Sequence, residues 1–231
     1  MNRTLRDIHG LRSIHGDFSD RGISDAKMDI ILSAAVRAAS SSARQPYSII
    51  LIDDRNTMRE LTGYAGARLA VFCVDLHRLS VIAGKLGYTV NEEPPEEMVT
   101  LRFDVALAVQ TAVIAARSLR IDSLITNGIN RTGIDRARER LRLPDGCTPL
   151  MSVVFGYSAN RRAKPKGRVF DDTIIHRGQY ATFTGDRADR VISQFDDPSN
   201  RLGLHDGWKA DGFAHYHDWF FTKWIGLSKK A

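Results

Sequence analysis

The chain has 231 residues, of which 43% are hydrophobic and 26% are charged. These proportions are ordinary for a globular protein and too apolar for a disordered one, and a chain of this length can bury a core without disulfides or a metal ion. Lysine and arginine number 33 against 27 aspartates and glutamates, so the net charge is +6. This mild positive excess favours an anionic ligand, such as a phosphate or a nucleotide, over a nucleic acid.

The cysteine content and the N-terminus predict the compartment. Two cysteines, Cys73 and Cys147, are too few for a disulfide framework. The N-terminus leads into polar and charged residues without the apolar core of a signal peptide, and the apolar runs are far shorter than the ~20 residues of a membrane helix. We therefore expect a cytoplasmic protein with reduced thiols and no membrane segment.

The first half of the chain alternates between predicted helices and buried strands. Ser24 is a good N-cap, and the apolar positions that follow Met28 recur at helical spacing until the serines at 40–42. The elements expected next are a strand at 47–52, a short helix around 58–61 that is broken by Gly63, a strand at 69–74, a helix at 76–86 and an acidic loop at 91–97.

Residues 101–119 predict a helix that is apolar nearly all round. Its apolar positions have a period near 3.6, and only a stripe that includes Asp104, Thr111 and Ser118 is polar. A helix of this kind is buried on most of its circumference. We expect it to be the central helix of the fold or of a subunit interface.

The second half of the chain also alternates between predicted strands and helices. The elements expected here are a strand at 121–126, a turn at 127–128, a helix at 134–141, a strand at 150–155 and a basic loop at 161–168. Near the C-terminus, Phe213, Tyr216, Phe220 and Trp224 share one face of a predicted helix. Because the strands and helices interleave without strict alternation, the pattern favours an α+β fold without an internal domain boundary.

Several kinds of site are excluded by their missing motifs. The sequence has no Gly-x-Ser-x-Gly elbow, no Walker A motif and no Gly-x-Gly-x-x-Gly after a predicted strand. On a helix the rings of His215 and His217 point in nearly opposite directions, so aromatic packing is favoured over a metal site there. No metal site and no catalytic side chain are expected.

Three polar loops lie beside predicted buried elements, at residues 12–15, 40–46 and 164–168. Arginine and lysine bind phosphate through charge-assisted hydrogen bonds, and serine adds a neutral donor. Since a single basic loop is most often just solvated surface, the order and context of the three loops matter more than any one of them.

Taken in order, these loops resemble the FMN-dependent nitroreductase family, and within it the branch of NADPH nitroreductases and flavin reductases with a long C-terminal arm. The resemblance covers nearly the whole chain. Its matching segments are residues 11–15, 34–46, 61–63, 71–78, 104–119, 127–128, 155–157 and 166–168. It implies one domain over residues 1–231, with a central mixed and mostly antiparallel sheet wrapped by helices and an arm from about residue 200.

The resemblance also implies a homodimer with FMN at two interface sites. The side chains that would hold the flavin phosphate are Arg12, Ser13, Lys166 and Arg168.

Other residues would contact the flavin ring. Ser40 and Ser41 would reach it from the neighbouring subunit, and the main chain at Asn127 and Gly128 would face the ring near N5, where a glycine allows close approach. His15 is the candidate for positive charge near the N1–C2 carbonyl of the flavin.

The implied activity is that of an NAD(P)H-dependent oxidoreductase. A hydride would pass from NAD(P)H by way of flavin N5 to a nitroaromatic, quinone or flavin acceptor in a ping-pong reaction, so the cofactor carries the difficult chemistry. Neither the acceptor nor the choice between NADH and NADPH follows from the sequence.

Some positions depart from the family pattern. Leu11 stands where a basic or imidazole side chain is usual, His15 replaces an arginine or lysine, Ala43 replaces an asparagine, and the segment between Gly63 and Leu69 is short. These departures leave open a relative that binds flavin weakly or not at all and acts as a binding protein. A basic nucleic-acid-binding module, suggested by the charge and the loop at 161–168, is the least favoured alternative.

Overall fold

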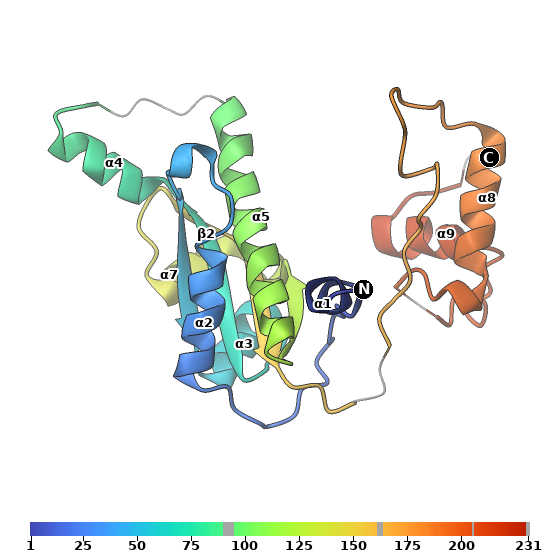
Figure 1. Cartoon of the computed structure of the whole chain (residues 1–231), viewed down its shortest axis with the longest axis horizontal. Coiled ribbons are helices and arrows are strands. Elements are labelled where there is room, and N and C mark those ends of the chain that lie inside the picture. Colours follow the sequence, from blue (N-terminus) through green and yellow to red (C-terminus); the bar gives the residue numbers. More distant parts are fainter. Residues whose placement is uncertain (90–94, 161–163, 205, 230–231) are drawn as a thin grey trace. The chain divides into compact units, whose positions relative to one another are not determined.

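The computed structural model describes residues 1–89, 95–160, 164–204 and 206–229 (Figure 1). The chain divides into two compact units, Met1–Ala163 and Lys164–Ala231, and each is described by itself. This division falls well before residue 200, where the sequence places the start of an arm. Part of the predicted acidic loop, at 91–94, and part of the basic loop, at 161–163, lie outside the described residues.

The first unit is built on a sheet of four antiparallel strands in the order β1-β2-β4-β3. The strands are β1 (Tyr47–Ile52), β2 (Arg68–Asp75), β3 (Asp122–Thr126) and β4 (Cys147–Gly156). All four were expected, although β4 begins earlier than the apolar run at 150–155 suggests. An isolated parallel bridge between Ser13 and Ser123 joins the N-terminal segment to β3.

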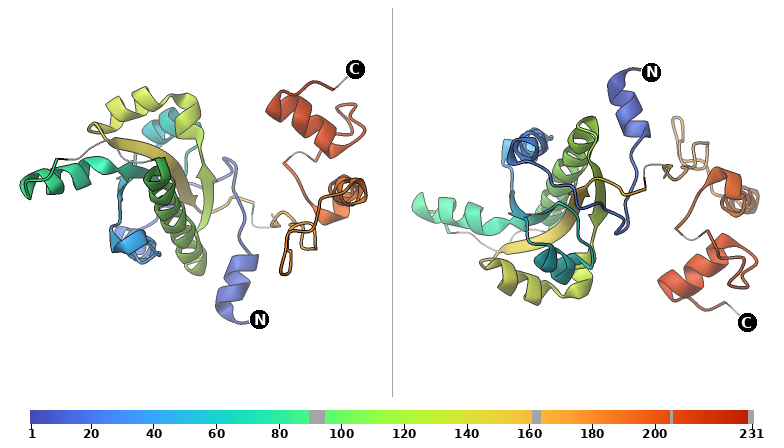
Figure 2. Two further views of the ribbon diagram at one scale, coloured as in Figure 1. Left: turned by 90° about the horizontal axis from the view of Figure 1, so that it is seen from above. Right: turned by 90° about the horizontal axis from the view of Figure 1, so that it is seen from below.

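Helices cover both faces of the sheet (Figures 1 and 2). The helices of this unit are α1 (Arg3–His9), α2 (Asp25–Ala35), η1 (Ser41–Ala43), α3 (Arg55–Thr62), α4 (Leu76–Lys85), α5 (Pro95–Ser118), α6 (Gly128–Thr132) and α7 (Ile134–Leu141). The alternation along β2 shows the two layers. Phe72 lies in the core cluster with α2 and α5, whereas Val71 lies in the cluster with α3, α6 and α7.

Local chemistry explains where several of these helices begin and end. Asp54 accepts a hydrogen bond from the Thr57 amide at the start of α3, and Asp75 accepts one from the Arg78 amide at the start of α4. Gly63 ends α3 with a φ of 80°, a left-handed conformation that glycine adopts without strain. Ser24 precedes α2 as predicted, but its side chain makes no capping hydrogen bond.

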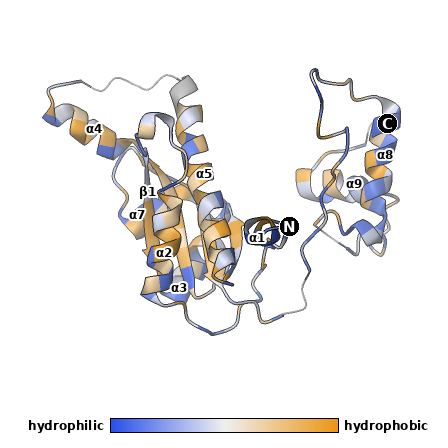
Figure 3. Cartoon of the chain, viewed as in Figure 1, coloured by the Kyte–Doolittle hydropathy of each residue, from blue (hydrophilic) through white to orange (hydrophobic). Residues whose placement is uncertain are grey.

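The long helix α5 is buried on one side only. Its buried side packs on the sheet and on α2, and Figure 3 shows much of the sheet in the hydrophobic colour. Val99, Phe103 and Leu107 form a stripe that remains exposed. Asp104, which the sequence pattern places in the polar stripe, is instead buried and bonded to the serine loop. Among the described residues, α5 is the one helix long and apolar enough to cross a membrane, and its inner face forms the core.

The second unit contains α8 (Gly185–Asp196), η2 (Pro198–Asn200), α9 (Tyr216–Trp219) and a π-helical segment, η3 (Phe220–Ile225). Helix α8 is not among the elements expected from the sequence. The aromatic face predicted near the C-terminus differs in part, because Phe213 precedes the helix and Trp224 is exposed. Tyr216 is buried and stacks on Phe195 of α8, with ring centroids 5.2 Å apart.

Candidate functional site

The N-terminal segment at 12–15 runs beside β3 as an extended strand-like chain. The Ile14 amide donates a 3.1 Å hydrogen bond to the Ser123 carbonyl, and the Ile14 side chain is buried. Alternate residues of an extended chain point to opposite sides. Accordingly, Ser13 and His15 are exposed, which is the placement that a ligand-binding role requires.

Arg12 lies on the other side of this segment and binds Asp122. Its Nε and Nη2 each lie 2.9 Å from a different carboxylate oxygen, and the two side chains are only 13% and 9% exposed. The Ser158 amide and Arg117 also bond to this carboxylate. Arg12 therefore ties the N-terminal segment to β3. The phosphate contact expected of it stays a prediction, and it would have to share the guanidinium with Asp122.

Burial and bonding act in opposite directions on the charge of Asp122. Burial raises the pKa of this carboxyl, but the Arg12 hydrogen bond, the Ser158 amide and the charges of Arg12 and Arg117 outweigh it, so the pKa is lowered overall. The pKa of Arg12 is raised, mainly by its hydrogen bond to Asp122. Both groups are thus charged at neutral pH.

The turn predicted at 127–128 leads directly into α6, which begins at Gly128, and this start of α6 is packed tightly against α3. A Cβ on Gly128 would lie 2.2 Å from the Thr62 carbonyl oxygen, so only glycine fits there. The Gly128 amide donates to Thr126 Oγ1 at 3.0 Å, while Asn127 is exposed. Close packing of two main-chain segments therefore explains why residue 128 is a glycine. The close approach of the flavin ring, which the family resemblance implies, would be a second reason.

Residues 62–64 connect this turn to the N-terminal segment. The Tyr64 amide donates to Thr62 Oγ1 at 3.1 Å, and the Tyr64 ring meets the His15 ring edge to face, with centroids 6.1 Å apart at 71°. Thr62 in turn contacts Gly128. The structure thus brings together two of the predicted segments, 13–15 and 127–128, with Tyr64 between them.

The serine loop at 40–45 is held by Asp104 of α5. Ser40 Oγ donates to Asp104 Oδ2 at 2.7 Å and accepts from the Gln45 amide, and the Ser41 amide donates to the same carboxylate at 3.1 Å. Ser42, Ala43 and Gln45 have φ between 48° and 54°, the left-handed region that is rare for such residues. The buried carboxylate thus fixes a strained loop, a feature that often accompanies functional sites.

Within one chain the serine loop lies far from the Arg12 end of α5. Asp104, which holds the loop, is several helical turns from Arg117, which contacts Asp122. This separation is roughly 20 Å along the helix axis at the usual rise per residue. The structure therefore does not bring Ser40 and Ser41 together with Ser13 and His15 of the same chain.

Lys166 and Arg168 belong to the second unit. Lys166 Nζ lies 2.6 Å from Asp206, the Gly167 amide donates to the Arg201 carbonyl, and Arg168 Nη1 donates to the Gly167 carbonyl at 2.7 Å. Both side chains are exposed. Their joint action with Ser13 on one phosphate stays a prediction, because the two units are described separately.

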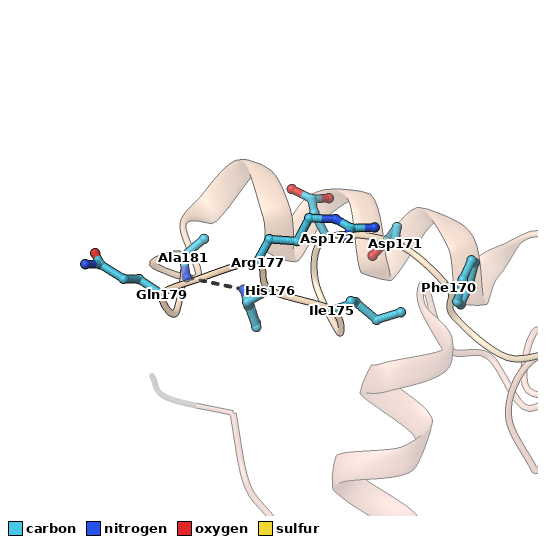
Figure 4. A pocket seen from close by; sticks show the side chains of 8 residues that line it. All are labelled: Phe170, Asp171, Asp172, Ile175, His176, Arg177, Gln179 and Ala181. Atoms are coloured by element: carbon cyan, nitrogen blue, oxygen red, sulfur yellow. Dashed lines mark hydrogen bonds between the residues drawn. The ribbon is translucent and has the colours of Figure 1, made fainter.

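The two cavities described here for the second unit include only one of the predicted site residues, Lys166. A cavity of about 420 Å³ lies beside Phe170, Ile175 and His176, and in Figure 4 the amide of Ala181 donates to His176 Nδ1. None of the predicted site residues lines it. A smaller cavity of about 180 Å³ lies beside Lys166, between α8 and the 206–209 segment.

The wall of the larger cavity is fixed to α8 by polar contacts. Asp172 pairs with Arg187 and Arg190 at 2.8 and 2.6 Å. Asp171 accepts hydrogen bonds from the hydroxyl and amide of Thr173 and from Gln194, and these bonds lower its pKa to about 2.

The chemistry of the donor set fits FMN. Ser13 and His15 present polar groups from one exposed edge, and neither the Tyr64 hydroxyl nor the His15 ring nitrogens have a hydrogen-bond partner within the described part of the chain. Lys166 and Arg168 supply exposed cations of the kind that a phosphate needs. Leu11, which replaces a polar family residue, packs against the core instead.

Comparison with known proteins decides the family. A model of the nitroreductase family matches residues 8–157, more than half of the chain. The chain belongs to the nitroreductase family. This confirms the resemblance seen in the sequence, and the α+β architecture expected of the family is also confirmed.

Related sequences cover most of this nitroreductase-family chain. It is 33% identical over 196 residues to an FMN reductase (NADPH) of Bacillus subtilis, covering 80% of this chain and 78% of that protein. It is 30% identical over 208 residues to an oxygen-insensitive NADPH nitroreductase of Salmonella typhimurium, covering 85% and 81% of the two chains.

Solved structures agree with the fold. The NfrA1 nitroreductase of Bacillus subtilis matches with a TM-score of 0.82 and 27% identity, over 97% of this chain and 94% of that chain. The NfrA2 protein of Bacillus megaterium matches with a TM-score of 0.84 over 98% and 93% of the two chains; at 22% identity, this match shows the fold alone.

Proposed function

We propose that this chain is an NAD(P)H-dependent FMN oxidoreductase that reduces nitroaromatic, quinone or flavin acceptors by a ping-pong mechanism. When bound, FMN supplies the centre that accepts and then donates a hydride. The relatives named as NADPH-dependent FMN reductase and nitroreductase support NADPH as the electron donor. The names of the same relatives support flavin and nitroaromatic acceptors, and the quinone acceptor comes from the family resemblance.

The observation that carries this proposal is the meeting of two separate segments at Tyr64. The exposed His15 ring contacts Tyr64, and Tyr64 is linked through Thr62 to Gly128. Ser13 lies exposed two residues before His15 on the same extended segment. Ser13 donates to the flavin phosphate together with Lys166 and Arg168, and His15 supports negative charge near the N1–C2 carbonyl. The Asn127–Gly128 main chain, fixed by Thr62 and Thr126, orients the face at which the ring binds.

The test is the visible absorption spectrum of the purified protein, followed by denaturation. A flavoprotein is yellow, and it releases FMN that is identified in the supernatant. A colourless protein that also fails to take up added FMN would favour a flavin-free binding protein instead. Nucleic-acid affinity that falls steeply with salt would favour the basic-module alternative.

The active form is a homodimer with the site at the interface. The separation of Ser40 and Ser41 from Ser13 along α5 supports this, because a second copy is needed for both groups to reach one flavin. The exposed stripe of Val99, Phe103 and Leu107 gives that copy an apolar surface to cover.

The second unit offers further apolar surface for assembly. Trp208 and Tyr216 are its buried hydrophobic residues among those described, whereas several large side chains stay exposed. These include Phe170, Ile174, Tyr180 and Phe183. Packing of this surface in the dimer would remove it from water. The free, buried thiols of Cys73 and Cys147 support a reducing compartment such as the cytoplasm.

A further inference from the structure

Among the described side chains of α5, Asp104 is the charged one that is buried, with 3% of its surface exposed. Its neighbour Phe103 is exposed to solvent, and Val105 lies in the core cluster with the sheet. Burial of a carboxylate is unfavourable unless hydrogen bonds satisfy its oxygens. The groups that bond to Asp104 therefore explain how this charge is tolerated inside the protein.

The carboxylate of Asp104 binds the first two residues of the serine loop. Ser40 Oγ donates to Oδ2 at 2.7 Å, and the Ser41 amide lies 3.1 Å from both carboxylate oxygens. Hydrogen bonds to a carboxylate are stronger than those between two neutral groups. Asp104 thus fixes both the side chain of Ser40 and the main chain at Ser41.

Ser40 connects this anchor to the far end of the loop. Its hydroxyl donates to Asp104, and its oxygen accepts from the Gln45 amide at 2.9 Å. A hydroxyl has a single proton, so Ser40 has no donor left for a ligand. The Ser41 hydroxyl oxygen accepts from Arg44 at 3.3 Å, and its proton meets no acceptor among the described residues. The two serines therefore differ, and Ser41 is the one whose hydroxyl can still donate.

The loop between these contacts has an unfavourable backbone. Three residues within 42–45 have φ between 48° and 54°, the left-handed region that a Cβ disfavours. Such a loop keeps one conformation only when its surroundings hold it. Gln45 Nε2 donates to the Val36 carbonyl at 3.1 Å, and Arg78 donates to the Gln45 carbonyl, so the far end is held by these bonds. The near end depends on Asp104.

We propose that Asp104 is a positioning residue for the flavin site, which acts through Ser40 to hold Ser41 in the conformation that binds the ring. The inference rests on the proposed function and adds to it a residue that acts without touching the cofactor. When Asp104 no longer holds the loop, a fraction of the molecules has the binding conformation, and the apparent dissociation constant for FMN rises by the inverse of that fraction. Once FMN is bound the loop is in place, so the turnover number at saturating FMN stays the same.

The test compares Asp104→Asn, Ser40→Ala and the double variant with the unaltered protein. Asp104→Asn keeps the size of the side chain but removes its charge and one of its two acceptor oxygens. The measurements are the dissociation constant for added FMN, the turnover number with NADPH at saturating FMN and the unfolding midpoint. Each single substitution should raise the dissociation constant about tenfold, the usual effect of losing one hydrogen bond. The double variant should bind no more weakly than the weaker single variant, because both substitutions remove the same contact.

The matched control is Asp54→Asn. Asp54 accepts from the Thr57 hydroxyl at 2.6 Å and from the Thr57 amide at 2.7 Å, so it also binds one hydroxyl and one amide, but at the start of α3. This variant should lower the unfolding midpoint and keep the FMN dissociation constant of the unaltered protein.

The outcomes separate this inference from the proposed function. If the unaltered protein binds no FMN, the proposed function fails and this inference fails with it. If it binds FMN but both single variants bind FMN equally well, or if their effects add in the double variant, the inference is overturned while the proposed function stands. An equal loss of affinity in Asp54→Asn would also overturn it, because the effect would then follow stability alone. Non-additive losses with an unchanged turnover number and an unchanged control support it.

Discussion

Arg12 and Asp122 form a two-point ion pair that joins the N-terminal segment to the start of β3, with Nε and Nη2 each 2.9 Å from the carboxylate. The same carboxylate accepts the Ser158 amide just beyond β4, so three segments meet at one buried charge. Because Arg12 immediately precedes Ser13, the ion pair with Asp122 fixes the position of Ser13. Arg12 thereby acts on the proposed site as a positioning residue.

Removing the carboxylate should destabilise the fold strongly. In Asp122→Asn, Arg12 keeps its charge in a largely buried position without its anionic partner, and breaking such a pair typically costs about 3–5 kcal/mol. The measurement is the free energy of unfolding from urea denaturation. FMN affinity should also fall, because Ser13 loses its support.

A more exposed set of ion pairs provides the control. Glu60, whose side chain is 31% exposed, bonds to Arg136 at 3.1 Å and to Arg140 at 3.5 Å, and Glu60→Gln should cost no more than about 1 kcal/mol. Equal effects of the two substitutions would contradict the structural role assigned to Asp122.

The Arg12–Asp122 pair also predicts a pH dependence. The pKa of Asp122 is lower in the folded protein than its ordinary value of about 3.9 in an unfolded chain. Its contribution to stability is therefore fully present above about pH 4 and is lost as the pH falls through the folded pKa. The stability difference between the unaltered protein and Asp122→Asn should be large at pH 7 and shrink below pH 4. Asp171, whose pKa is also lowered, is present in both proteins and cancels from the difference. A difference independent of pH would rule out the ionised carboxylate as its source.

The sequence predicted the sheet and most helices because their signals are local. The buried strands are continuous apolar runs, and α3 and α7 have clear breakers or caps beside them. Helix α8 was missed although Ala188, Val191, Ile192 and Phe195 recur at helical spacing. Its contacts with Asp172 and Tyr216, which are distant in sequence, could not be predicted.

The candidate site was predictable only in part. The motif resemblance predicted Ser13 and His15, which the structure places exposed on one segment. It could not predict that Arg12 faces Asp122, because that depends on which side of an extended segment packs inward. Asp122 and Asp104 were visible signals, as charged residues at the start of a buried strand and on an apolar helix. Tyr64 became apparent only when the fold placed it beside His15.

The two cations of the second unit should bind phosphate. Lys166→Ala and Arg168→Ala together should raise the FMN dissociation constant by about tenfold or more for each side chain, since a charge-assisted hydrogen bond contributes about 1.5–3 kcal/mol. The control is Lys164→Ala, which removes a neighbouring exposed cation without a predicted contact. Unchanged FMN affinity in the double variant would refute the assignment. Riboflavin, which lacks the phosphate, should bind both proteins alike.

Assembly can be tested on the exposed stripe of α5. Phe103 is 62% exposed in the single chain, and the proposed dimer covers it. Phe103→Asp would bury a carboxylate at that interface, an unfavourable transfer, so the dimer should dissociate at micromolar concentration. Light scattering coupled to size exclusion reports the mass.

The matched control for assembly is Ile30→Asp. Ile30 is 55% exposed on α2 and is not part of the α5 stripe, so this variant should keep the mass of the unaltered protein.

Dissociation of the Phe103→Asp variant should also release FMN, because Ser40 and Ser41 of the second copy would then be removed from the flavin ring. A folded monomer of the unaltered protein that retains FMN would contradict the interface site. A Phe103→Asp variant that stays dimeric would instead place the interface elsewhere on the chain.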